Sequence, residues 1–369
     1  MQKTRWVANA LLGAVLSGCI LAHTSAGAEP VKISIGYQPW FAGGVSADVI
    51  RGLGPTLWKK FLPADVEVEF QASPQGPVII NNMLADKQQI GYLGDMPGVV
   101  ATTKSQMADI RMVAVTSFSS GQMCHLLLVR KDAPAFKSSK EAIQWINGKV
   151  VAAPKGGCTD LFFRTVMKDA KIVPKQYGHQ GVEQIVTNFR VGKLDAAVIP
   201  DFPRSKIEAE GTARLVATGF DFNLPDAGVM VMRKDFMDKY PEIAKGWLRM
   251  EMYVQVNYLM DRSKWDEVVK MAVEQNPGYT KEQIWASLFA SIPADKGGAP
   301  VRQTFPFVFD DQVRAKMMGA YRFLNEIKII DVDKPRDGAM DDALARQVAA
   351  DAKLKLPLGE IKGAAVGPK

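Results

Sequence analysis

The stretch Gly148–Arg164, GKVVAAPKGGCTDLFFR, combines residue types that could hold a small polar ligand. It predicts a buried strand at 150–153, a turn at Pro154–Gly157, and a helix that begins at Cys158 or Thr159. Glycines in such a turn let the backbone approach a ligand closely, and the first N–H groups of a helix carry a partial positive charge. The stretch therefore predicts a cradle for an anionic or strongly polar group. The alternative is an ordinary strand–turn–helix connection whose glycines serve only packing.

Alternating strands and helices surround this cradle. Before residue 118, helices from Ser46 and Pro77 separate strands predicted at 31–36, 66–70, 89–94 and 111–117. Such alternation predicts a parallel sheet covered on both faces. A second alternating block contains an amphipathic helix from Gly181, and its strands are predicted at 125–130, 150–153, 196–199 and 213–217.

The remainder of the chain predicts mostly helix. After a strand at 228–232, one long helix is expected at 241–260, followed by helices at 263–273, from Thr280, and at 310–327. The last fifteen residues, rich in Pro, Gly and small side chains, are expected to be loosely held.

The first 28 residues predict an export signal. Lys3 and Arg5 precede an apolar run at 6–22, and Ala26–Ala28 supplies a small-residue cleavage site. The run is too short for a membrane anchor. Leu16–Cys19 resembles a bacterial lipoprotein box, which would give a lipid anchor at Cys19. Since the apolar run continues past Cys19, cleavage after Ala28 is favoured.

Composition excludes several classes of function. The 369 residues suit about two domains. Loss of Lys3 and Arg5 with the signal lowers the formal charge from +7 to +5, and the other basic residues are scattered among acids, so no nucleic-acid partner is expected. Beyond the signal, His125 and His179 lack the paired spacing of metal ligands, so neither a metal nor a cofactor is expected.

Two cysteines remain after the signal, Cys124 and Cys158, in an oxidising compartment. They predict either a structural disulfide or two separate buried thiols. A reactive thiol or a soft metal site is the less favoured interpretation.

Four motifs in fixed order resemble one known family. They are a GYQPW loop after the first strand, GYLGDMPGV after the third, KGGCTDLFFR in the cradle, and GKLDAAVIPD in the second block. Their order and spacing resemble the periplasmic solute-binding proteins of bacterial ABC importers, in the nitrate, sulfonate, taurine and bicarbonate group. The resemblance covers residues 31 to about 235 and extends to the C-terminal helices only generically.

This resemblance implies a type II two-lobed α/β fold with a hinge of two crossing strands and a ligand cleft between the lobes. Lobe I would comprise 29–118 plus 221–369, and lobe II 119–220; the irregular links near 118 and 219 agree with these bounds. It also implies a monomer in the periplasm that captures a small polar organic solute by cleft closure and delivers it to an inner-membrane permease.

Ligands of open α/β sheets bind beyond the carboxyl ends of the strands, which places the predicted site. The first lobe is expected to contribute Gln38, Trp40, Phe41, Asp95 and Met96, and the second Gly157, Cys158, Thr159, Asp160 and Asp201. Two of these have structural alternatives, since Trp40 could fill a core and Asp95 could be a helix N-cap.

The predicted site is acidic, with Lys155 as the only cation in its loops. Three carboxylates, Asp95, Asp160 and Asp201, therefore predict a solute that carries an amine or another donor beside its acidic group, as a sulfonate such as taurine does. In the resembled family a small hydroxyl residue usually stands at the position of Cys158, and Cys124 should lie at the same rim. A disulfide between them is expected.

An enzyme or a sensor of the same fold, acting on a thiamine-pyrimidine-like ligand, is the rival interpretation. Cys158 and His125 could then form a nucleophile and its base. The Cys-rich motif of the pyrimidine synthase is absent, and export argues against a biosynthetic role, so no enzyme is expected.

Overall fold

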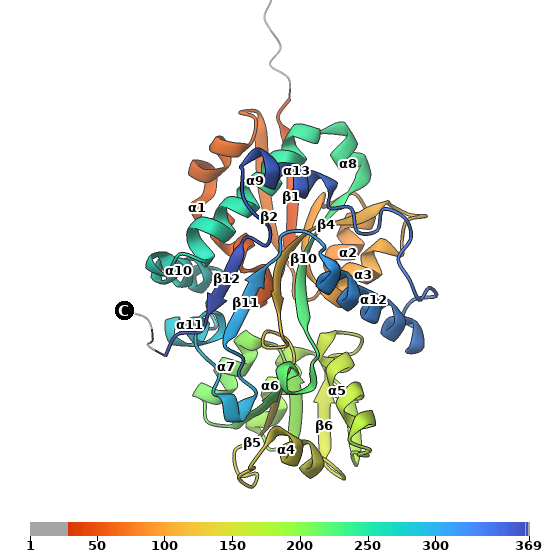
Figure 1. Cartoon of the computed structure of the whole chain (residues 1–369), viewed down its shortest axis with the longest axis vertical. Coiled ribbons are helices and arrows are strands. Elements are labelled where there is room, and N and C mark those ends of the chain that lie inside the picture. Colours follow the sequence, from red (N-terminus) through yellow and green to blue (C-terminus); the bar gives the residue numbers. More distant parts are fainter. Residues whose placement is uncertain (1–28, 366, 368–369) are drawn as a thin grey trace, which may run out of the picture.

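The computed structural model describes residues 29–365 and residue 367, which form two lobes, each built on one sheet (Figure 1). The predicted export signal and the alternative anchor at Cys19 lie outside the described residues. Within residues 29–365, no helix is both long and apolar enough to cross a lipid bilayer.

The larger sheet has seven strands in the order β12-β11-β4-β10-β3-β1-β2. These strands are β1 (Val31–Tyr37), β2 (Val66–Ala72), β3 (Ile90–Gly94), β4 (Ile110–Ser119), β10 (Asp226–Arg233), β11 (Val301–Phe305) and β12 (Gly359–Lys362). β1 is parallel to β2 and β3, as predicted, but β10 lies antiparallel between β3 and β4. All eight residues of β10 are buried, which explains why this returning strand occupies the centre of the sheet rather than its edge.

The smaller sheet has five strands in the order β7-β6-β8-β5-β9. They are β5 (Leu126–Arg130), β6 (Val150–Ala153), β7 (Gln176–His179), β8 (Ala196–Ile199) and β9 (Ala213–Thr218). β6 is parallel to β7 and β8, whereas β5 runs antiparallel to β8 and β9. β7 was not predicted, because a four-residue edge strand with half-exposed side chains has no clear apolar alternation.

Helices cover both faces of both sheets (Figure 1). The helices are α1 (Val45–Phe61), α2 (Gly76–Leu84), α3 (Asp95–Thr102), α4 (Ser139–Trp145), α5 (Cys158–Asp169), α6 (Val182–Arg190), α7 (Asp201–Ala209), α8 (Lys234–Lys239), α9 (Pro241–Val254), α10 (Trp265–Gln275), α11 (Lys281–Leu288), α12 (Asp311–Glu326) and α13 (Ala343–Asp351).

The C-terminal third differs from the prediction of helix throughout. β11 and β12 pair with each other, and β11 joins the larger sheet beside β4. Within the last fifteen residues, which were expected to be loosely held, Gly359–Lys362 form β12 and are anchored in the sheet. The predicted long helix at 241–260 ends as α-helix at Val254 and continues as a π-helical turn at Gln255–Leu259.

The chain reaches the second lobe in three places rather than two. The chain passes from the larger sheet to the smaller one between β4 and β5 and returns between β9 and β10, at the two predicted crossing links. A third segment, residues 289–300 after α11, also lies on the second lobe, where Figure 1 shows it beside α7. Ile292 of this segment is buried in a core cluster with Leu126 and Ile199, and Thr218 donates a 2.5 Å hydrogen bond to the carbonyl of Gly297.

Candidate functional site

The loop after β1 is held against the first lobe by hydrogen bonds to its backbone. The carbonyl of Gly43 accepts from the Thr116 hydroxyl at 2.6 Å and from the Ser117 hydroxyl at 3.1 Å. A Cβ added at Gly43 would lie 2.5 Å from the Phe41 ring, so only glycine fits beneath that side chain. Gln38 and Phe41 are buried, and Trp40 is half-buried against the largest core cluster.

Asp95 occupies the first turn of α3, where Gly94 is the N-cap. One carboxylate oxygen of Asp95 accepts from the Met96 amide at 2.7 Å, and the other lies 2.7 Å from the Nζ of Lys316 on α12. The Lys316 side chain is only 5% exposed, and the ion contact is not aligned as a hydrogen bond. Within residues 29–365, the Lys316 ammonium therefore has N–H groups without an acceptor.

The second-lobe cradle folds as predicted, with a disulfide at its base. α5 begins at Cys158 after Gly157, and Cys158 is bonded to Cys124, with their Cα atoms 6.2 Å apart. This confirms the expected disulfide and attaches the first crossing link to the first turn of α5. Thr159, the next residue, is buried.

Asp160 organises the cradle turn from inside the second lobe. Its carboxylate accepts from the Gly156 amide at 2.8 Å, from Arg164 Nε at 2.7 Å, and from the Tyr177 hydroxyl. Gly156 has a φ of +68°, a left-handed conformation that favours glycine. Burial and the neighbouring Asp160 carboxylate raise the pKa of Tyr177, so its hydroxyl stays protonated as a donor.

Asp201 is fully buried between two arginines. Arg204 donates to one carboxylate oxygen at 2.7 Å, and Arg302 of β11 donates to the other. Arg302, 2% exposed, also donates to the carbonyls of Gln122 at 2.6 Å and Ser287 at 2.7 Å. Burial raises the pKa of the Asp201 carboxyl, and the two guanidinium groups act in the opposite direction.

These contacts correct the expectation of an acidic, uncompensated site. Each of the three carboxylates has a cation within hydrogen-bond distance, supplied by Lys316, Arg164, or Arg204 with Arg302. The helical pairs Asp160–Arg164 and Asp201–Arg204 have i,i+4 and i,i+3 spacing and could have been found in the sequence. Lys316 and Arg302 lie too far along the chain for any local pattern to place them.

His125 does not form a nucleophile–base pair with Cys158, because the Cys158 sulfur is in the disulfide. His125 Nδ1 lies 2.8 Å from the carbonyl of Leu224, and its ring stacks on Phe162 at 5.4 Å between centroids. Burial lowers the pKa of His125, which keeps the ring neutral. Since a carbonyl can only accept, Nδ1 carries the proton and Nε2 has a buried lone pair without a partner among the described residues.

The cradle meets the first lobe at α3 and α12. Leu161 packs against the core cluster that contains Met96 and Met317. A Cβ at Gly156 would lie 3.6 Å from Ile329, just beyond α12. The structure thus brings Met96 and Asp95 to the same side of the molecule as the cradle.

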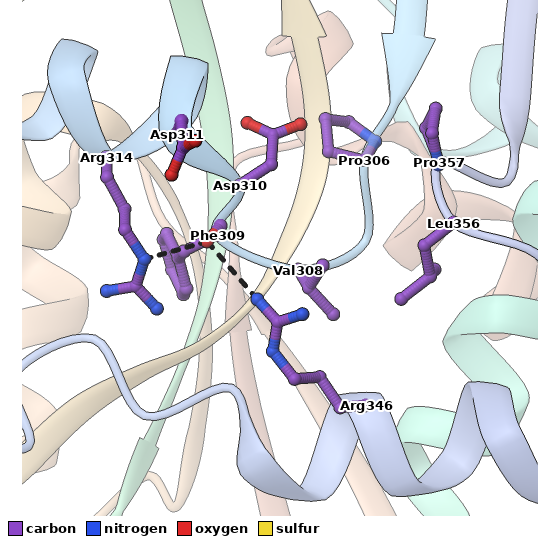
Figure 2. Close-up of a pocket in the computed structure, with 9 residues that line it drawn as sticks. All are labelled: Pro306, Val308, Phe309, Asp310, Asp311, Arg314, Arg346, Leu356 and Pro357. Atoms are coloured by element: carbon purple, nitrogen blue, oxygen red, sulfur yellow. Dashed lines mark hydrogen bonds between the residues drawn. The ribbon is translucent and has the colours of Figure 1, made fainter.

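A pocket of about 360 Å³ lies elsewhere on the first lobe, and none of the ten predicted residues lines it. Figure 2 shows Arg314 and Arg346 converging on the carbonyl of Phe309, to which they donate at 2.8 and 3.3 Å. Asp342 pairs with both arginines, so the two guanidinium groups are already compensated. Among residues 29–365, no cluster of three His, Cys, Asp or Glu side chains could hold a metal ion.

The chain is similar to a curated binding protein. It is 22% identical over 253 residues to the taurine-binding periplasmic protein of Escherichia coli strain K12, a match that covers 66% of this chain and 72% of that protein. No family model matches the chain.

Solved structures with periplasmic-binding folds also match. The alkanesulfonate-binding protein SsuA of Xanthomonas axonopodis pv. citri, bound to MOPS, matches with a TM-score of 0.62 and 19% identity, covering 85% of this chain and 97% of that one. The periplasmic nitrate-binding protein NrtA of Synechocystis PCC 6803 matches with a TM-score of 0.65 and 13% identity, covering 89% and 90%. These likenesses confirm the two-lobed α/β fold and the resemblance predicted from the four motifs.

Proposed function

We propose that this protein is the solute-binding component of a bacterial ABC importer, and that its solute is a small organic oxyanion of the sulfonate class. The observation that carries the proposal is the sequence likeness to a taurine-binding periplasmic protein on a chain with the two-lobed fold. The solute would be captured between the lobes in the periplasm by a monomer and passed to an inner-membrane permease.

The ligand class follows from which polar groups of the site are already paired. The carboxylates of Asp160 and Asp201 are occupied by protein donors, so neither is free to receive a ligand amine. Lys316 Nζ and Asp95 Oδ2 lie 2.7 Å apart as an ion pair without an aligned hydrogen bond, so among the described residues both atoms lack a hydrogen-bond partner. An unpaired buried donor such as this ammonium is costly unless a ligand or water satisfies it. The named ligands of the similar proteins, taurine, alkanesulfonate and nitrate, share an oxyanion. The proposal therefore replaces the expected amine with an anionic group as the main determinant of binding.

The predicted site residues take two roles in this proposal. The solute would be lined by Gln38, Trp40, Phe41, Met96, Gly157, Cys158 and Thr159. Asp95, Asp160 and Asp201 would position their surroundings through the ion pairs described above, and Lys316 would donate to the acidic group of the solute.

Calorimetric titration of residues 29–369 tests the ligand class. Taurine and ethanesulfonate are expected to bind, nitrate more weakly, and ethylamine not at all. Binding of ethylamine without binding of either sulfonate would refute the proposed class. Binding of none of the four would refute the function as stated.

The Lys316→Met variant tests the donor. Loss of hydrogen bonds from a charged group removes about 1.5–3 kcal/mol, so affinity for ethanesulfonate should fall roughly 10- to 100-fold. The double variant Asp95→Asn/Lys316→Met removes both charges and avoids an unpaired Asp95, and it should lose affinity equally. Arg314→Met, at the separate pocket in Figure 2, is the matched control and should bind as the wild type does.

A further inference from the structure

Net charge is divided unequally between the two lobes. Residues 119–220 contain 15 Lys and Arg but only 9 Asp and Glu, which gives the second lobe a formal charge of +6. The rest of the chain after the predicted signal, 29–118 and 221–369, contains 29 Lys and Arg and 30 Asp and Glu, a formal charge of −1. All of the excess positive charge therefore belongs to the second lobe.

The basic residues are dispersed along the sequence, but the fold gathers several lysines at one edge of the five-stranded sheet. Lys149 directly precedes β6 and Lys175 directly precedes β7, whereas Lys131 directly follows β5. Lys193 lies three residues before β8. Because β6 is parallel to β7 and β8, and β5 is antiparallel to β8, these four strand ends lie at the same edge. Each of four neighbouring strands therefore has a lysine there.

Backbone hydrogen bonds join the loops at this edge into one surface. The Gly148 amide donates to the Val173 carbonyl at 2.9 Å, and the Lys131 amide donates to the Thr212 carbonyl at 3.1 Å. Neighbouring strands are about 4.8 Å apart, so a row along four strands spans about 15 Å. The crossing links join β5 and β9 at their other ends, and Figure 1 shows β5 and β6 at the end of the molecule away from the larger sheet. The lysine row therefore faces away from the first lobe.

Neighbouring acids do not neutralise these lysines. The exposed lysines of this edge, none of which takes part in an ion pair of the described residues, are Lys131, Lys171, Lys175 and Lys193. The nearby carboxylates of Asp132 and Asp195 both pair with Arg130, at 3.2 and 3.4 Å. Asp169, at the end of α5, follows Lys168, which offsets its charge. The edge therefore keeps a surplus of ammonium groups in contact with solvent.

Two strongly exposed apolar side chains lie among the lysines. Val173, 74% exposed, lies between Lys171 and Lys175 in the sequence, and Val191, 60% exposed, is two residues before Lys193. A lipid headgroup region suits this combination, because it shelters aliphatic side chains while lysine ammonium groups stay hydrated beside the phosphates. We call this surface, defined by Lys131, Lys149, Lys171, Val173, Lys175, Val191 and Lys193, the basic tip.

We propose that the basic tip binds the surface of a membrane that contains anionic phospholipid, with its lysines at the phosphate groups and with Val173 and Val191 in the layer beneath them. A row of unpaired ammonium groups about 15 Å long matches a planar array of phosphates better than it matches one small anion. A soluble polyanion offers the same charge without an apolar layer, so the two valines favour lipid. This surface goes beyond the proposed function and needs no solute, because none of the ten predicted site residues belongs to it.

Vesicle sedimentation of residues 29–369 tests the membrane contact. Vesicles of phosphatidylcholine with about one-third phosphatidylglycerol should bind the protein at least tenfold more tightly than vesicles of phosphatidylcholine alone. Because the lysines are exposed, about 0.5 M NaCl should remove most of this difference. Equal binding to the two compositions, or binding to neither, would overturn the proposal.

Neutral variants test whether the tip itself carries the binding. Each lysine near an anionic surface strengthens binding about fivefold, so Lys171→Gln/Lys175→Gln/Lys193→Gln should weaken binding to the anionic vesicles at least tenfold. The matched control, Lys59→Gln/Lys60→Gln/Lys87→Gln, removes the same charge from exposed lysines of the first lobe and should weaken binding less than threefold. Equal losses would assign the binding to net charge and contradict the proposal.

The valines distinguish a lipid surface from a soluble polyanion. Val173→Ser/Val191→Ser should weaken binding to the anionic vesicles at least threefold and leave binding to heparin unchanged. Unchanged binding to the vesicles, or tighter binding of the wild type to heparin than to the vesicles, would overturn the assignment to lipid. Titration of ethanesulfonate into the same variants should match the wild type, so failure of the proposed function and failure of the membrane contact are measured separately.

Discussion

The two lobes meet at two places with different chemistry, which we call the fixed edge, around Asp201 and Arg302, and the free edge, between α5 and α12. At the fixed edge, a buried aspartate lies between two arginines and is surrounded by buried amide and hydroxyl groups. At the free edge, Leu161 packs on the cluster that contains Met96, and a Cβ built on Gly156 would lie 3.6 Å from Ile329, so no charged side chain is among the three. Separation of the lobes should therefore cost more free energy at the polar, buried contact than at the apolar one.

The arginine at the centre of the fixed edge should give the largest effect. Arg302→Met leaves the buried Asp201 with one cation, and removal of one partner from a buried ion pair costs about 3–5 kcal/mol of unfolding free energy. Urea unfolding measures this loss, with Arg314→Met as the control, because Arg314 is partly exposed and its partner Asp342 keeps a second arginine, Arg346. Asp201→Asn added to Arg302→Met should restore part of the stability. A loss below about 1 kcal/mol for Arg302→Met would mean that this cluster does not hold the edge together.

Removal of the disulfide shows whether the stability of the second lobe and the contacts between the lobes depend on each other. Cys124→Ser/Cys158→Ser removes a cross-link between residues 34 apart and should lower the unfolding free energy by roughly 3–4 kcal/mol. Cys124 is two residues from Gln122, whose carbonyl accepts from Arg302, but the other partners of Arg302, Asp201 and the Ser287 carbonyl, do not depend on the bridge. Maleimide should therefore still label a Ser287→Cys thiol slowly under native conditions, since Ser287 is buried. Fast labelling of Ser287→Cys in the variant would show that the fixed edge depends on the disulfide.

Two isoleucines allow the edges to be compared with one substitution. Ile292→Ala, at a residue 8% exposed in the fixed edge, should cost about 2–4 kcal/mol, because it leaves a cavity in a packed cluster. Ile329→Ala, at a residue 36% exposed in the free edge, should cost less than about 1 kcal/mol. Urea unfolding of both variants in one buffer checks the comparison, which fails if Ile329→Ala proves the more costly.

Acid should weaken the region behind the free edge through His125, which stacks on Phe162 of α5. Burial lowers the pKa of folded His125, with Asp226 and Asp95 opposing the shift and Lys316 adding to it. The unfolded chain therefore binds this proton more readily, and the stabilisation present above about pH 6.5 is lost as the pH falls toward the folded pKa. The unfolding free energy should fall as the pH falls below about 6.5, with a slope that cannot exceed about 1.4 kcal/mol per pH unit for one proton. His125→Gln should flatten the profile in that window; an unchanged slope would assign it to other groups.

The fold could be predicted where its determinants are local. The alternation of β1 and β2, the cradle at Gly148–Arg164 and the capping box of α11 with Thr280 and Gln283 are all found in the structure. β11 was missed although Val301, Gln303 and Phe305 alternate, because the surrounding helical pattern outweighed a five-residue strand. β10 was predicted as a strand, but its place between β3 and β4 depends on a return from the second lobe that no local pattern contains.

The candidate site was harder to predict than the fold, because charge compensation acts over long range. The rule that ligands bind beyond strand ends predicted that Asp95 and Asp201 lie just after strands, where the structure has the first turns of α3 and α7, but it said nothing of their partners. Those partners, Lys316 and Arg302, lie on α12 and β11. Only the tertiary structure shows that each carboxylate of an apparently acidic site has a cationic partner, and that the ammonium of Lys316 forms an ion pair without an aligned hydrogen bond.

Titration of ethanesulfonate into the wild-type protein, residues 29–369, tests whether the protein recognises an oxyanion that carries no amine. It offers the oxyanion without an amine, so it separates the proposed ligand class from the donor-dependent alternative. The account predicts saturable one-to-one binding, weakened roughly 10- to 100-fold by Lys316→Met. Absence of binding by ethanesulfonate, with binding of taurine retained, would contradict it and return the amine to the centre of recognition.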